Sequence, residues 1–290
     1  MSCVLCLVSC VLCLTSKSNV LKLFFREEGA EGKNIVIVHG LYGSSDNWLT
    51  AGKKLGAKHH VYLVDQRNHG RSPKSPDHTY EAMKEDLAEF FRANQIEKAT
   101  VIGHSMGGKT AMAFAADYPE MVEKLVVVDI VPKDYRLIGE DSQYNQHRHI
   151  LEALTEVENN CERFRSREDI SNFLELKLDG RDLVRFLLKS LYRDKESKQF
   201  KCRINIASLN NSLDEIVSGV NEKFFSDRIP ILNYPVLFIK GGKSGYIRQE
   251  DFSLIRRIYP EAAISVIPDA GHWLHAEQPA LFMETLEKFI

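Results

Sequence analysis

Residues 101–108 read Val-Ile-Gly-His-Ser-Met-Gly-Gly and contain the pattern G-x-S-x-G over Gly103–Gly107. A β-branched run, residues 99–102, precedes the pattern, and an alanine-rich segment of helical character, residues 109–116, follows it. This strand–turn–helix order is typical of a nucleophile elbow, in which a serine lies on a sharp, strained turn. Glycine on either side of the serine avoids a collision of a Cβ with the adjoining strand and helix. We therefore predict that Ser105 is a nucleophile rather than an idle serine in a tight turn.

Length and composition restrict the class of protein. The chain has 290 residues, enough for one large α/β domain with an inserted subdomain. Its formal net charge of −2 provides no basic surplus to neutralise phosphates, which argues against a nucleic-acid partner. Four of the six cysteines lie within the first 13 residues, and their spacing predicts neither a disulfide framework nor a metal site.

The first 19 residues form an apolar leader, in which residues 2–8 are nearly repeated by residues 9–15. The leader is too short to span a bilayer as a helix and has no basic residue ahead of its apolar run. We predict that it is not part of the fold, that the protein does not insert stably into a membrane, and that it is cytoplasmic. Export or lipid anchoring through this cysteine-rich stretch is the alternative.

Apolar runs alternate with helical patterns over most of the remaining chain. Strands are expected near residues 34–38, 60–65, 99–102, 123–129, 235–240 and 263–267, with an edge strand from Leu21. Helices are expected over 46–55, 79–94, 109–116, 249–259 and 278–290. This alternation predicts a mostly parallel, doubly wound sheet.

The alternation breaks between residues 132 and 230, where charged residues are more frequent and helices are expected near 143–158, 167–178 and 180–190. We predict a helical cap over residues 132–230, inserted into a core made of residues 20–131 and 231–290.

A serine nucleophile needs a base, and in this architecture the order along the chain is serine, acid, histidine. His147 and His149 fall in the predicted cap, where we expect them to be solvated. His272 lies in a loop after the last strand, at the carboxyl edge of the sheet, and His275 falls in the first turn of the next helix. We predict His272 as the base, with His275 as the alternative.

The acid must lie just after a strand, close to the base. The turn after the strand at 236–239 carries no carboxylate, and Glu250 and Asp251 fall in the next helix. Asp129 ends the adjoining strand, whereas Asp269 shares a short loop with His272, which makes a hydrogen bond between the two awkward. We predict Asp129, with Asp269 as the alternative.

Two further loops contribute to the predicted site. His39–Gly43 follows the strand at 34–38, where backbone N–H groups complete an oxyanion hole, so we assign the two donors to Leu41 and Met106. His39, Tyr42 and Trp273 are predicted to contact substrate, with His39 in a positioning role. Asp65 and Arg67 are interpreted as members of a tight turn held by its own polar side chains.

These motifs resemble the α/β-hydrolase superfamily, and in particular its YbfF-like esterase branch, which includes abhydrolase-domain relatives of animals. The resemblance rests on residues 103–109, 39–43, 65–72 and 271–277, in that family's order, and extends from Leu21 to Ile290. In that branch the acid stands in an Asp-Ile-x-Pro setting, which residues 129–132 match, and a cap segment Phe-Leu-Leu-Lys-Ser is matched by residues 186–190. The resemblance implies an α/β-hydrolase fold that cleaves short- to medium-chain acyl esters, and some thioesters, without a cofactor.

We therefore predict a serine esterase that acts on a small-molecule acyl ester and needs no metal. An acyl-CoA thioesterase or a C–C bond hydrolase or lyase on the same fold is the first alternative, because the segment 181–203 carries several basic residues. A non-catalytic ligand-binding protein is the second alternative.

Overall fold

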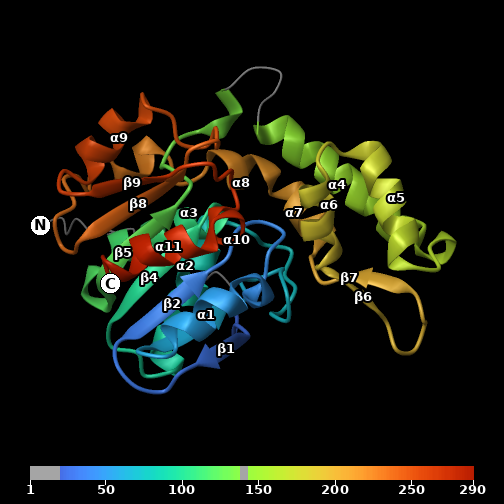
Figure 1. Ribbon diagram of the computed structural model, residues 1–290, viewed down its shortest axis with the longest axis horizontal. Coiled ribbons are helices and arrows are strands. Elements are labelled where there is room, and N and C mark those ends of the chain that lie inside the picture. Colours follow the sequence, from blue (N-terminus) through green and yellow to red (C-terminus); the bar gives the residue numbers. More distant parts are fainter. Residues whose placement is uncertain (1–19, 138–142) are drawn as a thin grey trace, which may run out of the picture.

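The computed structural model describes residues 20–137 and 143–290, so the leader lies outside the described residues. Seven strands form one sheet in the order β1-β3-β2-β4-β5-β8-β9 (Figure 1). β1 pairs antiparallel with β3, and every other pair in this sheet is parallel. The predicted mostly parallel sheet is confirmed. The strands are β1 (Phe25–Glu28), β2 (Asn34–Val38), β3 (His60–Val64), β4 (Ala99–His104), β5 (Val122–Val128), β8 (Val236–Gly241) and β9 (Ala263–Ile267).

Helices cover both faces of the sheet because the side chains of its strands alternate between two cores. Ile35 and Ile37 of β2 face a core that includes residues of α1 (Leu49–Leu55) and α11 (Pro279–Glu287). Val36 and Val38 face the other core, which includes residues of α2 (Tyr80–Ala93), α3 (Met106–Asp117) and α9 (Asp251–Ile258). Successive residues of a strand point to opposite faces, so one apolar run supplies both layers.

Between β5 and β8 the chain leaves the sheet and forms the group of helices on the right of Figure 1. The helices α4 (Gln143–Asn159), α5 (Arg167–Lys177) and α6 (Arg181–Leu188) correspond to the three that the sequence predicts. A hairpin of β6 (Leu191–Arg193) and β7 (Phe200–Cys202), and the short helices α7 (Ile206–Asn211) and α8 (Leu213–Ser218), were not predicted. A short α10 (Leu274–Glu277) precedes α11.

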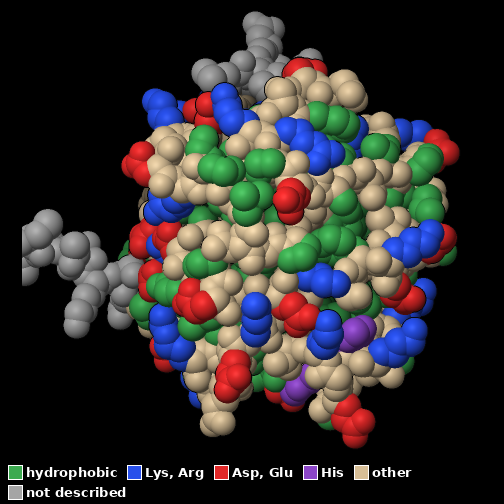
Figure 2. Space-filling view, turned by 90° about the vertical axis from the view of Figure 1, so that its left-hand side faces the viewer, with side chains coloured by type: hydrophobic (Ala, Val, Ile, Leu, Met, Phe, Trp, Pro, Cys, Tyr) green, Lys and Arg blue, Asp and Glu red, His purple; other side chains and the backbone are tan. Residues whose placement is uncertain are grey.

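The surface carries charges of both signs. Figure 2 shows the face at the left of Figure 1, where acidic and basic side chains are interspersed among hydrophobic ones. No field of one sign covers this face, in keeping with the formal net charge of −2. Among the helices of the described residues, none is long and apolar enough to cross a membrane.

Candidate active site

Ser105 lies on a sharp turn between β4 and α3, with φ 54° and ψ −123°. A Cβ on Gly103 would lie 2.3 Å from the carbonyl oxygen of Gly107, inside the turn. A Cβ on Gly107 would lie 2.4 Å from the carbonyl oxygens of Val38 and His39, at the end of β2. Both distances are far below van der Waals contact, so only glycine permits this approach of strand and helix. These are the collisions that the sequence pattern predicts.

Asp129 follows β5 at the neighbouring strand end and is fully buried, with φ 51°. Its Oδ2 atom lies 2.7 Å from Nδ1 of His272 and also accepts a hydrogen bond from the hydroxyl of Ser244. Its Oδ1 atom accepts a hydrogen bond from the backbone N–H of Gly241 at 3.0 Å. The alternative acid, Asp269, instead points outward: its side chain is 72% exposed and pairs with Lys243. The structure thus brings Asp129, not Asp269, to the imidazole.

The His272 ring is fixed by two contacts, and its backbone by a third. Its Nδ1 atom is held by Asp129, and its ring stacks on Tyr246 with centroids 3.8 Å apart and planes 13° apart. The His272 carbonyl oxygen lies 2.8 Å from Nε2 of His104, the residue before the serine. Burial lowers the pKa of His104 well below its usual range, so this ring is neutral and Nε2–H donates to the carbonyl. His275, by contrast, stacks on Trp48 at 4.1 Å.

Ser105 and His272 line one pocket, which encloses about 160 Å³. Its wall is mostly apolar and aromatic, and it includes the predicted residues Tyr42 and Trp273, the latter packed on Phe186 with ring centroids 5.1 Å apart. A second pocket of about 20 Å³, called the inner pocket below, also has Ser105 in its lining, together with tyrosines, aliphatic side chains, Gln143 and Lys109. The residues shared by the two pockets are Leu41, Ser105, His147 and Tyr246.

His147 lies where the two pockets meet, on α4. The Tyr42 hydroxyl donates to the His147 carbonyl oxygen at 3.3 Å, and the Tyr246 hydroxyl lies 3.4 Å from its Nε2 atom. Burial lowers the pKa of His147 to about 4, so its ring is neutral at pH 7. The expectation that His147 is solvated is therefore wrong, because α4 places the ring against Tyr42 and Tyr246 in the pocket lining. His149, two residues on, is exposed as expected.

The backbone N–H groups of Leu41 and Met106 lie beside Ser105, and within the described part of the chain neither donates a hydrogen bond. Both residues are buried. Two unpaired backbone N–H groups beside a nucleophile are suited to donate hydrogen bonds to a developing oxyanion.

His39 lies behind this wall rather than in the lining of either pocket. Gln66 N–H donates to its Nε2 atom at 3.0 Å, so its Nδ1–H donates to the Gly40 carbonyl oxygen at 2.8 Å. Burial lowers its pKa to about 4, which keeps the ring neutral and this arrangement fixed at neutral pH. Its place is that of a positioning residue for the loop that carries Leu41.

Within residues 20–137 and 143–290 no group of three or more His, Cys, Asp or Glu side chains could hold a metal ion.

Comparison with known proteins places the chain in a family. Residues 33–279 match the model of the alpha/beta hydrolase fold. The chain is 35% identical over 274 residues to "Esterase YbfF" of Escherichia coli, covering 93% of this chain and 99% of that protein. It is 36% identical over 262 residues to "sn-1-specific diacylglycerol lipase ABHD11" of Danio rerio, covering 88% of this chain and 78% of that one. A solved structure described as "Marine microorganism esterase" superposes with a TM-score of 0.85 at 41% identity, covering 93% of this chain and all of that one. The chain therefore belongs to the α/β-hydrolase family.

Proposed function

We propose that the protein is a serine hydrolase that cleaves carboxylic esters through an acyl-enzyme. The observation that carries this proposal is the 2.7 Å contact of Asp129 with His272 beside the pocket that holds Ser105. The carboxylate accepts a hydrogen bond from Nδ1–H, which fixes the tautomer in which Nε2 of His272 has a free lone pair. Nε2 takes the proton of the Ser105 hydroxyl as the oxygen attacks the acyl carbon, and then returns that proton to the leaving alcohol. Water, deprotonated by the same Nε2, releases the acid.

The tetrahedral oxyanion is held by the N–H groups of Leu41 and Met106. Both donors are fixed in the folded protein, so they need little reorganisation when charge develops. Removing one such donor typically raises the activation free energy by about 3 kcal/mol.

The outer pocket favours a neutral, short- to medium-chain substrate. Its volume of about 160 Å³ is close to that of a cavity of roughly 150 Å³ that holds one benzene molecule. No Lys, Arg, Asp or Glu side chain belongs to its lining. Its lining includes none of the basic residues considered for acyl-CoA, which are Arg185, Lys189, Arg193, Lys198, Lys201 and Arg203. These features support an ester substrate over a CoA thioester.

The test is the variant Ser105→Ala with p-nitrophenyl acetate and butyrate. We expect turnover to vanish, and a fluorophosphonate probe to label the wild-type protein but not the variant, while the circular dichroism spectrum is unchanged. Ser218→Ala is the matched control, since among the described residues that hydroxyl bonds only within α8, to the Asp214 carbonyl oxygen. Turnover or labelling retained by Ser105→Ala would refute the assignment.

A further inference from the structure

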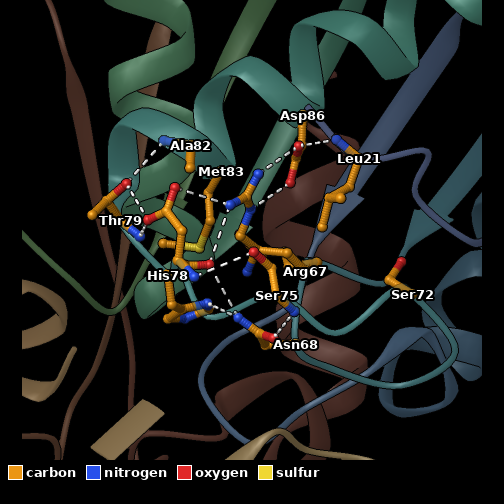
Figure 3. A network of polar contacts seen from close by, with 12 residues as sticks. Leu21, Arg67, Asn68, Ser72, Ser75, His78, Thr79, Ala82, Met83 and Asp86 are labelled. Carbon is orange, nitrogen blue, oxygen red and sulfur yellow. Dashed lines mark hydrogen bonds and ion pairs between the residues drawn. The ribbon is translucent and has the colours of Figure 1, made fainter. Parts of the chain in front are cut away.

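The loop between β3 and α2, residues 65–78, carries buried polar side chains that the proposed mechanism does not use. Arg67, Asn68, His69 and His78 are each 0% exposed. Figure 3 shows several of them in one network beside α2. Their burial is costly unless each hydrogen-bonding group is satisfied, so the network has a specific arrangement to maintain.

One end of this 65–78 loop is fixed to the core. The Arg67 guanidinium makes two parallel hydrogen bonds to Asp86 of α2, at 2.7 and 2.9 Å, as Figure 3 shows. Asp86 also accepts a hydrogen bond from the backbone N–H of Leu21 at 2.7 Å. Asp65 accepts the N–H of Arg71 within the loop at 2.8 Å and the backbone N–H of Ser45, outside the loop, at 2.5 Å.

Asn68 connects the loop to one oxyanion donor. Its Oδ1 atom accepts the backbone N–H of Ser75 at 2.7 Å, which fixes the amide orientation and leaves Nδ2 as the donor facing Nδ1 of His78 at 3.3 Å (Figure 3). Because Nδ1 of His78 accepts, its Nε2 carries the proton and points at Sδ of Met106, 3.4 Å away. Burial keeps the pKa of His78 well below its usual range, so the neutral form persists.

His69 connects the same loop to the other donor. Its Nε2 atom accepts the backbone N–H of Tyr42 at 3.2 Å, and its Nδ1–H donates to the Arg67 carbonyl oxygen at 2.9 Å. Tyr42 has φ 63° and directly follows Leu41. The loop therefore contacts the side chain of Met106, which carries one unpaired amide, and the backbone of Tyr42, which directly follows the other, Leu41.

The helical segment between β5 and β8 docks on the same asparagine. Asn205, the N-cap of α7, donates its backbone N–H to the Asn68 carbonyl oxygen and its side-chain Nδ2 to Asn68 Oδ1, both at 2.9 Å. Asn68 Nδ2 in turn donates to the Ser208 hydroxyl at 3.1 Å.

We propose that the 65–78 loop couples the seating of α7 to the geometry of the oxyanion hole, with Asn68, His69 and His78 as positioning residues. This inference rests on the proposed function. Oxyanion donors are effective only within a narrow range of positions, so a displaced α7 disturbs transition-state binding more than ground-state binding.

The test is Asn205→Asp, which is nearly isosteric. One carboxylate oxygen still accepts the N–H of Ser208 and caps α7. The other replaces the Nδ2 donor, so it faces two acceptors, Asn68 Oδ1 and the Ser75 carbonyl oxygen, and is repelled by both. The matched control is Asn221→Asp. Asn221 is also an N-cap, with Oδ1 accepting the Lys223 N–H and Nδ2 donating to the Ser218 carbonyl oxygen, away from the 65–78 loop.

For Asn205→Asp we expect kcat on p-nitrophenyl butyrate to fall about tenfold, a fraction of the 10²–10³ lost with a whole oxyanion donor, with little change in KM. Affinity for an alkyl boronic acid, which forms a tetrahedral adduct on the serine, should fall by a similar factor. Asn221→Asp should leave both quantities near the wild-type values.

Equal kcat values for the two variants, or a loss confined to KM, would overturn the coupling while leaving the esterase assignment intact. Absence of ester turnover by the wild-type protein would overturn both. If Asn205→Asp does not fold, the pair Ser208→Ala and Ser218→Ala makes the same comparison, and there a fall in kcat is expected for Ser208→Ala alone.

Discussion

Replacing Asp129 by asparagine changes one atom and reverses the two hydrogen bonds that Oδ2 accepts, from His272 and from Ser244. The N–H of Gly241 donates to Oδ1, so in Asp129→Asn the amide oxygen takes that position and the NH₂ group takes the place of Oδ2. This NH₂ then faces Nδ1 of His272, 2.7 Å from the replaced oxygen, and can only donate to it. Nδ1 becomes the acceptor, and Nε2 carries the proton toward Ser105, where a lone pair is required.

The size of the effect follows from this change of tautomer. The same substitution in trypsin-like proteases, where the geometry is preserved, lowers kcat about 10⁴-fold. That factor corresponds to roughly 5.4 kcal/mol of activation free energy. Asp129 here is fully buried, and the Gly241 N–H requires an acceptor at the Oδ1 position, so the asparagine is equally unable to turn. We expect a loss of about 10⁴-fold in kcat.

The assay is turnover of p-nitrophenyl butyrate at pH 7.5, measured beside Asp269→Asn. Asp269 is exposed and pairs only with Lys243, so we expect that variant to keep wild-type activity. A circular dichroism melt checks that both variants fold. If Asp129→Asn kept more than a tenth of the wild-type kcat, or if Asp269→Asn lost activity to a similar extent, Asp129 would not be the orienting acid.

Three further predictions concern the elbow, the pocket and acid stability. Gly107→Ala places a Cβ 2.4 Å from the backbone of β2 and should lower the free energy of unfolding, measured by urea titration, by at least about 2 kcal/mol. The control is Gly245→Ala at an exposed position, where no atom lies within 4 Å of the new Cβ, and it should change that free energy by less than about 0.5 kcal/mol. His147→Ala should join the inner and outer pockets and shift the preferred p-nitrophenyl ester to longer acyl chains; an unchanged chain-length profile would show that this ring does not separate them. Burial lowers the pKa of His39 to about 4 and that of His69 to about 3, so between pH 6.5 and 4 the unfolded chain binds protons that the folded chain does not. The free energy of unfolding should therefore fall as the pH drops below 6.5, and equal urea midpoints at pH 7 and pH 5 would contradict this.

The fold and the meeting of Asp129 with His272 were predictable because they depend on local rules. Continuous apolar runs indicate buried parallel strands, and the carboxyl ends of such strands share one edge of the sheet. A carboxylate directly after β5 and a histidine after β9 are thereby directed to one region. Glycine is required at positions 103 and 107 because a Cβ there would collide with the backbone of α3 and of the end of β2, respectively.

The contributions of His147 and Tyr246 were not predictable in the same way. Whether a ring on α4 faces solvent or the pocket depends on how that helix sits over the sheet, and several polar residues surround His147 in the sequence. Tyr246 reaches His272 only because the loop after β8 folds back over Asp129. Likewise, β6 and β7 are three residues long each, too short for an alternating pattern to indicate them.

The interpretation of Asp65 and Arg67 as members of a self-contained turn is incomplete for both residues. Asp65 also accepts the backbone N–H of Ser45, which lies outside the loop, and Arg67 reaches α2. The guanidinium pairs with Asp86, which lies on α2 and is separated from it by 19 residues. A spacing of that length carries no periodic signal, so the pair emerges only once β3 and α2 are packed.

The Ser244 hydroxyl and the His272 ring meet the same oxygen of Asp129, although Ser244 belongs to a different crossover of the chain. A carboxylate at position 244 would therefore lie within reach of the imidazole from the opposite side. The double variant Asp129→Asn with Ser244→Asp should regain part of the activity lost in Asp129→Asn alone. The loops after β5 and β8 could then each carry the acid, so its position in the sequence can change while the nucleophile and the base keep theirs.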